Sequence, residues 1–175
     1  MSDLNNEHQS NLAIIPAQGA TVAALGLTAA NQISLFGCTS PCSMLFNNMG
    51  VYVNTAGPAG TLFSVGIYDG ISRQLIAGLQ NRNGANVGLH NAVINGNIKS
   101  GQSLIVAWSH NNATNVLRLK SVNTSAMTLL MTDSLDSRFS GEINLLGGGV
   151  LLDPLPLSSD PSISYASPII LLRLV

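Results

Sequence analysis

The chain has 175 residues, a length that suits a single domain large enough to bury a core without disulfides or metal ions. Hydrophobic residues make up 46% of it, but Asp, Glu, Lys and Arg together make up only 9%, compared with about 25% in typical soluble domains. The seven basic residues form no patch, which argues against a nucleic-acid partner, and no apolar run approaches the roughly 20 residues of a membrane-spanning helix.

The N-terminal part, residues 1–32, is predicted to be an arm and entry segment that precedes the folded domain. Residues 1–11 are polar and aperiodic, and the Ala-rich stretch 20–31 fits either one or two helical turns or an extended strand. The start lacks the basic and apolar regions of a signal peptide, so we expect the chain to fold in a cytoplasm. Between these stretches lies a short apolar patch that supplies candidate contact residues: Leu12, Ile14 and Ile15.

Two cysteines, Cys38 and Cys42, lie four positions apart around Pro41. They offer too few ligands for a structural zinc site unless a distant His90 or His110 joins them. A small disulfide loop is sterically possible, but a reducing cytoplasm disfavours it. We therefore expect two reduced thiols and no metal ion or cofactor, with a late disulfide as the alternative.

Residues 49–110 have the pattern of short strands separated by turn residues. Asp69-Gly70 and Asn95-Gly96 are dipeptides that favour the tight turns joining antiparallel strands. No segment here is long enough for the crossover helices of a parallel sheet, so the pattern predicts antiparallel β structure. The clearest strand is TLFSVGIYD, in which alternate apolar residues share one face: Phe63, Val65 and Ile67.

The strand pattern continues through VLRLKSV and AMTLLMTD, and residues 133–149 are rich in turn formers. The proline-rich stretch 153–161 is predicted to run extended over the surface, because proline cannot occupy an internal strand. Several short strands with turn signals at this spacing indicate a sandwich or jelly roll. The prediction is one all-β domain, an antiparallel jelly-roll-like β-sandwich, over residues 33–175.

The last segment, SYASPIILLRLV, is apolar on both faces of a predicted strand. Such a strand must be covered on both faces. Two interpretations remain open: it is a central strand of one sheet, or it completes its burial against a neighbouring subunit, with exchange between copies as one form of this. In the second case, one face supplies the predicted subunit interface: Ile169, Leu171, Arg173 and Val175.

No pattern of catalytic residues is present in the sequence. It contains no nucleophile elbow, P-loop, dinucleotide fingerprint or paired histidines on a helix. Its histidines also have no acidic residue at a spacing that would indicate a catalytic pair. Trp108 could in principle stack on a sugar ring, but it shares its face with Leu104 and Val106, which favours a place in the core. We therefore do not expect an enzyme.

Two strand motifs give the chain a resemblance to a known group of proteins. In GVYVNTA the matching positions are Val51, Val53, Thr55 and Ala56, and in LFSVGIYD they are Val65, Gly66, Ile67, Tyr68 and Asp69. With SLIVAWS and the closing PIILLRLV, these segments resemble a domain of structural proteins in the virions of tailed bacteriophages. The resemblance covers residues 50–108 and the last dozen residues.

Such domains occur in capsid decoration (cement) proteins and in head or tail fibres. The resemblance implies a virion protein, and the roughly forty residues before the sandwich suit a compact decoration protein better than a fibre. Low charge also suits a permanent assembly, because neutral polar surface is cheap to desolvate, although a low-charge secreted β protein would share this composition. We expect a homotrimer that binds the major capsid protein on the outside of a phage head assembled in the host cytoplasm. The alternative is a fibre or receptor-binding domain that recognises a host glycan.

Overall fold

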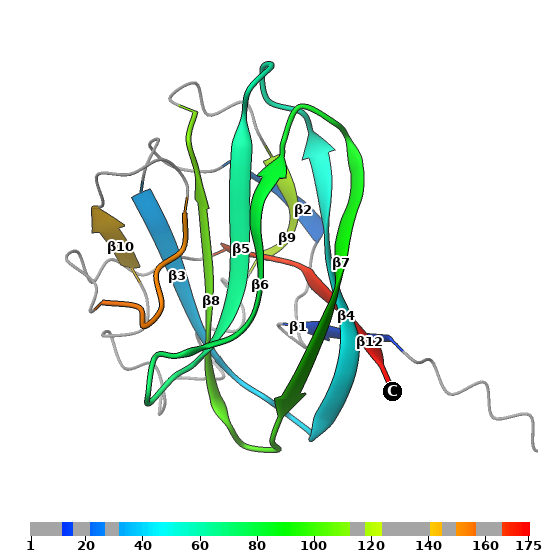
Figure 1. Ribbon diagram of the computed structural model, residues 1–175, viewed down its shortest axis with the longest axis vertical. Helices are drawn as coiled ribbons and strands as arrows, with labels where there is room; N and C mark the ends of the chain where they lie inside the picture. The colour runs from blue at the N-terminus through cyan, green and yellow to red at the C-terminus, as the bar shows by residue number, and fades with distance from the viewer. Residues whose placement is uncertain are drawn as a thin grey trace, which may run out of the picture.

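The computed structural model describes residues 12–15, 22–26, 32–112, 118–123, 141–144, 150–156 and 166–175. These residues form strands and no helix (Figure 1). The strands are β1 (Leu12–Ile15), β2 (Val22–Gly26), β3 (Gln32–Thr39), β4 (Met44–Thr55), β5 (Leu62–Asp69), β6 (Leu75–Asn83), β7 (Gly88–Ile98), β8 (Ser103–His110), β9 (Arg118–Asn123), β10 (Gly141–Asn144), β11 (Ala166–Pro168) and β12 (Ile170–Leu174).

The strands form two antiparallel sheets that pack against each other. Sheet A contains the path β1-β12-β4-β9-β11, with β7 on the other edge of β4 and β2 beside β9, and sheet B has the order β10-β3-β8-β5-β6. Eight of these strands make two layers, β1-β12-β4-β7 and β3-β8-β5-β6, which is the arrangement of a jelly roll. The predicted antiparallel β-sandwich is therefore confirmed.

The main core lies between the two sheets. Phe63, Val65 and Ile67 are fully buried on the inner face of β5, as their alternation predicts. Trp108 belongs to the same core, so the prediction that it packs inside and is not exposed for stacking is confirmed. On the facing strand β4, the pairing register shifts between Phe46 and Asn48. This shift leaves the consecutive Asn47 and Asn48 outside the core, and the apolar side chains before and after them stay buried.

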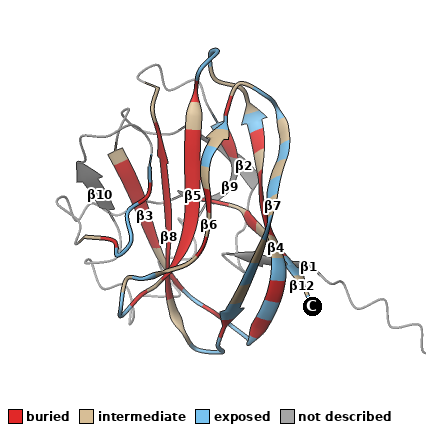
Figure 2. Cartoon of the chain, in the orientation of Figure 1, coloured by how far each residue is buried: buried red, intermediate tan, exposed pale blue. Residues whose placement is uncertain are grey.

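A second apolar cluster covers the outer face of sheet B. Residues 150–156, called here the cover segment, place Leu151 and Leu155 against Tyr68 and its neighbours on β3 and β8. Consequently β3, β5 and β8 are buried along most of their length (Figure 2). Over residues 153–156 the chain forms no strand, as the prolines predict, but it bends at 153 and 154, and Leu155 packs into a core where the prediction had an extended run over the surface. Residues 157–161 lie outside the described part.

Of the two predicted tight turns, one is present and one is wrong. Asp69-Gly70 begins the loop between β5 and β6, although the left-handed conformation falls at Arg73 (φ 61°). Asn95-Gly96 instead lies within β7, opposite Phe46, because only a glycine leaves room for the Phe46 ring. The chain turns after β7, where Gln102 N–H donates to the Lys99 carbonyl at 3.1 Å.

Part of the predicted arm contributes strands to sheet A. Strand β1 pairs with β12, and β2 pairs with β9, so the Ala-rich stretch is extended over residues 22–26 and not helical. In β9, which overlaps the strand predicted at VLRLKSV, Leu119 is buried and Arg118 is exposed, the alternation typical of a strand. The predicted strand AMTLLMTD and most of residues 133–149 lie outside the described part of the chain.

Candidate interaction surfaces

The closing strand β12 is a central strand of sheet A, paired with β4 on one side and β1 on the other. Its inner face carries Ile170 and Leu172, which are fully buried in the core between the sheets. The opposite face, which supplies the predicted subunit interface, is more open: Leu171 is half-buried and Arg173 is exposed. The structure therefore supports the first interpretation, a central strand, for the pairing within one chain. A role of the outer face in a subunit interface remains a prediction.

The outer residues of β12 continue across β4 and β7 as rows of paired residues. One row joins Arg173, Asn48 and Val93, and the next joins Leu171, Gly50 and Asn91. Directly opposite residues of antiparallel strands share a face, so these rows form one surface. We call it the β12–β4–β7 face, made of Leu45, Asn47, Asn48, Gly50, Tyr52, Leu89, Asn91, Val93, Leu171, Arg173 and Val175.

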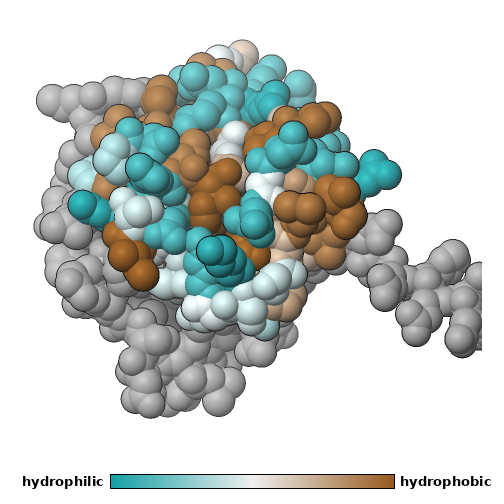
Figure 3. All heavy atoms as spheres, turned by 60° about the horizontal axis from the view of Figure 1, so that its bottom comes forward, coloured by the Kyte–Doolittle hydropathy of each residue, from teal (hydrophilic) through white to brown (hydrophobic). Residues whose placement is uncertain are grey.

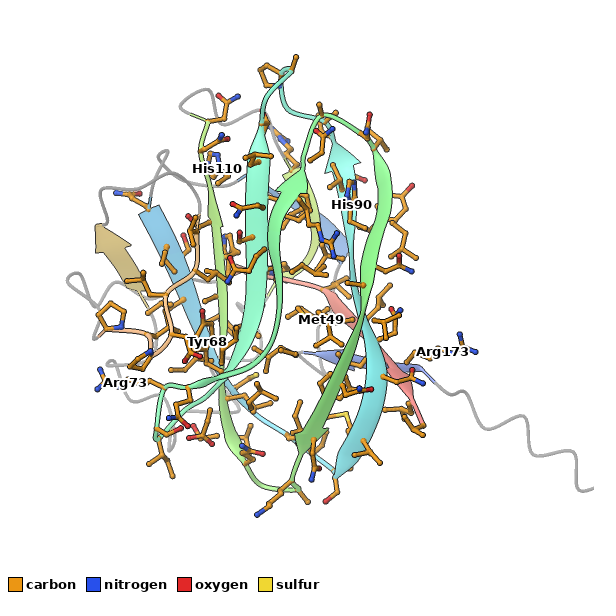
Figure 4. All side chains as sticks on the ribbon, viewed as in Figure 1. Met49, Tyr68, Arg73, His90, His110 and Arg173 are labelled. Atoms are coloured by element: carbon orange, nitrogen blue, oxygen red, sulfur yellow. The ribbon has the colours of Figure 1, made fainter. Side chains whose placement is uncertain are left out.

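This surface combines exposed aliphatic side chains with neutral amides. Val93 is 82% exposed and Val175 is 77% exposed, and Val175 is tied to the sheet by its N–H donating to the Leu45 carbonyl at 3.0 Å. Arg173, which extends away from the sheet in Figure 4, is the one charged side chain on the face as defined. The lower end of the molecule likewise shows apolar and polar side chains interspersed (Figure 3). A surface of this kind is cheap to desolvate.

The structure brings the two predicted contact sets next to each other. In the register of β1 and β12, Leu12 lies opposite Arg173, Ile14 opposite Leu171 and Ile15 opposite Ile170. The predicted capsid-contact residues are thus one strand away from the predicted subunit interface. Sequence reasoning missed the other two strands of the face, β4 and β7, although the stretch Ala92-Val93-Ile94 of β7 is apolar on both faces, as the closing strand is.

The other chemically notable groups have structural roles. The pKa of the Asp69 carboxyl is lowered by the N–H of Ser72, which donates to Oδ1 at 2.6 Å, and by the side chain of Gln102, which donates to Oδ2 at 2.8 Å. Asp69 therefore closes the β5–β6 loop. His90 Nε2 donates to the Asn86 carbonyl at 2.9 Å, and buried His110 accepts from a backbone N–H through Nδ1.

Both cysteines are free thiols in the structure, in line with the expectation of two reduced cysteines. Cys38 is buried, and this burial raises the pKa of its thiol to about 12, whereas Cys42 is exposed. Within the described ranges, no three His, Cys, Asp or Glu side chains group as a metal site would require. Nor does the described part hold a helix that could span a membrane.

Comparison with known proteins does not place the chain in a family. No family model matches the sequence, and no curated protein matches it.

Proposed function

We propose that this protein is a capsid decoration protein, a homotrimer that binds the major capsid protein on the outside of a phage head and stabilises the shell. The proposal rests on the sequence resemblance, on the low charge and on the jelly-roll sandwich. Its mechanism is binding, without a cofactor and without enzymatic chemistry. A protein that binds only the expanded shell stabilises that form by mass action.

The structural observation that supports the subunit contact of this proposal is the β12–β4–β7 face. Val93 and Val175 are exposed aliphatic side chains on the outer side of a sheet whose inner side holds the core. Exposed aliphatic side chains that gather on one face favour a role in protein–protein contact. In the proposed trimer this face is covered by neighbouring subunits, which accounts for its single charge.

The apolar patch of β1 is assigned to the capsid contact. Leu12, Ile14 and Ile15 lie along the edge of sheet A next to β12. In a trimer held together by the β12–β4–β7 face, this edge strand would lie at the border of each subunit contact. Contact with the shell would then be coupled to trimer formation.

Copy number on the virion tests the proposal against its alternative. Quantitative mass spectrometry should find the protein in numbers comparable to the capsid-protein positions it decorates. A few copies per virion would instead indicate a fibre or receptor-binding protein. Heads lacking the protein should take it up again from solution, and the variant Ile14→Asp should bind them less well than Ile71→Asp, a matched change on the exposed β5–β6 loop.

A further inference from the structure

The four-stranded layer β1-β12-β4-β7 has an open edge at each end. Within the described part of the chain, β1 pairs with β12 alone and β7 pairs with β4 alone. Figure 1 shows β7 beside β6 near the turn that joins them, at the upper end, and separating from it toward the lower end. The unpaired N–H and C=O groups of a strand edge are a template for pairing with another chain.

Neither of these two edges carries the residues that usually prevent such pairing, which are charged residues and prolines. Strand β7 has 11 residues without Asp, Glu, Lys, Arg or Pro, and the sequence of β1 is Leu-Ala-Ile-Ile. The edge strands β6, β10 and β11, in contrast, carry Arg82, Glu142 and Pro168. Both edges of the layer are therefore suited to pairing with a further strand.

One row of paired residues shows that the core is incompletely covered at both edges. Met49 of β4 lies opposite Leu172 of β12 on one side and Ala92 of β7 on the other. Leu172 in turn lies opposite Ala13 of β1. In the middle of the row, Met49 and Leu172 are fully buried, whereas the alanines at its two ends are only partly buried against the same core. A strand added at either end would complete this burial.

The two edges match each other in direction and in height. Three antiparallel pairings lead from β1 to β7, so these two strands run in opposite directions. A rotation about an axis parallel to the strands preserves the direction of each strand and the height of each residue along the axis. It would bring β1 of a second copy beside β7 as an antiparallel neighbour, with Ala13 of that copy level with Ala92. A contact between two different edges can repeat and close into a ring.

We infer that β7 of each subunit pairs antiparallel with β1 of the next subunit, so that the three layers of the trimer form one closed sheet. This inference rests on the proposed trimer and specifies how its subunits are joined. The pairing covers Ala13 and Ala92 and supplies partners to the backbone groups along both edges. Pairing of β7 with β7 of a second copy would instead be isologous, and it would join subunits only in twos and leave β1 open.

Engineered disulfides test which edges meet. In a background in which the exposed Cys42 is changed by Cys42→Ser, Ala13→Cys is combined with Ala92→Cys, or with His90→Cys or Ile94→Cys to allow for a register shift of two residues. Within one chain, Ala13 and Ala92 are three strand spacings apart, about 14 Å, so a disulfide between these positions must join two subunits. Light scattering should find a trimer, and mild oxidation should convert it to covalent trimers on a non-reducing gel.

The controls use the alternation of β7 and separate the inference from the trimer itself. Asn91→Cys and Val93→Cys lie on the opposite face from Ala13 and should form little covalent trimer with Ala13→Cys. A trimer that no inner-face combination cross-links would overturn the edge pairing and leave the proposed trimer standing. Covalent dimers from Ala92→Cys alone would show an isologous contact and would also overturn it. A monomeric Cys42→Ser parent would overturn both the trimer and the inference.

A charge on the edge tests the same contact without cross-linking. Ala92→Lys places an ammonium group at the end of the row and should give folded monomers, because lysine on an edge strand opposes pairing. Ile76→Lys, at a partly buried residue of the edge strand β6 in the other sheet, is the matched control and should leave the trimer intact. Light scattering gives the oligomeric state, and circular dichroism checks the fold. An intact trimer from Ala92→Lys would contradict the edge pairing.

Discussion

The two outer faces of the sandwich differ in how far the chain itself covers them. On sheet B, the cover segment lies over Tyr68 and buries Leu151 and Leu155, so that β5 is buried on both sides. On sheet A, the β12–β4–β7 face keeps aliphatic side chains such as Val93 in the open. Figure 2 shows the contrast between the continuous burial of β5 and β8 and the alternation along β7. The outer face of sheet B is buried by a segment of the same chain. The β12–β4–β7 face is left open and is suited to burial by a second copy.

Removing a side chain from the covered face should have the largest effect. Leu155→Ala deletes a side chain that is 1% exposed and is expected to lower the free energy of unfolding by about 2–4 kcal/mol, because a cavity replaces buried apolar contacts. Urea denaturation followed by circular dichroism measures this. The neighbouring Leu152→Ala is the control, since Leu152 is exposed, and should cost less than about 1 kcal/mol. Equal losses for both variants would show that the cover segment does not pack as described.

Charging the open face should change assembly and leave the protomer folded. Val93→Asp places a carboxylate at the centre of the proposed subunit contact, and light scattering after gel filtration should find monomers in place of trimers, because a charge in an interface core is costly. Ile71→Asp changes an even more exposed side chain on a distant loop and should leave the trimer intact. A trimer from Val93→Asp would place the subunit contact elsewhere.

Two glycines provide a matched comparison of the faces. A Cβ at Gly66 of β5 would lie 2.8 Å from Leu151 Cδ1 beneath the cover segment, whereas a Cβ at Gly50 of β4 would lie 3.2 Å from Leu89 Cδ1, which is free to move outward. Gly66→Ala should therefore cost about 1–3 kcal/mol of unfolding free energy. Gly50→Ala should change the stability of the monomer by less than about 0.5 kcal/mol. Thermal unfolding of both variants in the Val93→Asp background compares them; a reversed order would contradict the assignment of covered and open faces.

The sequence predicted the class of fold and the inward residues of its regular strands. Alternation was sufficient for Phe63, Val65 and Ile67, because local periodicity alone decides which side of a strand faces the core. The turn prediction failed at Asn95-Gly96. There the glycine is needed for a contact with Phe46, a residue fifty positions away. A dipeptide that permits a turn does not show whether the backbone uses it.

The sequence did not reveal where the surfaces lie, because they depend on long-range pairing. Nothing local indicates that residues 150–156 cover Tyr68, or that β1 lies beside β12. The orientation of Arg82 is a further example: it pairs with the buried Phe63 because β6 has one extra residue there, which only its register with β5 shows. The proposed interface residues on β12 were identified from hydrophobicity, but β7 completes the face through its pairing with β4.

The smallest effect is expected at the hydrogen bond that ties the cover segment to sheet B. Tyr68 Oη donates to the Leu152 carbonyl at 2.8 Å, and Tyr68→Phe should cost about 0.5–1.5 kcal/mol at neutral pH, as the loss of one such bond does. Urea denaturation measures this cost.

The same bond should give the protein a distinct response to alkali. Burial and, secondarily, the charge of Asp153 raise the pKa of Tyr68, so its neutral form is favoured in the folded state. For a raised pKa, the stabilisation is fully present below the unfolded value, near 10, and is lost as the pH rises through the folded value. Wild-type stability should therefore fall more steeply above about pH 10 than that of Tyr68→Phe. Parallel curves for Tyr68→Phe and the wild type would show that Tyr68 ionises as freely in the folded chain as in the unfolded one, and that the cover segment leaves its hydroxyl open to water.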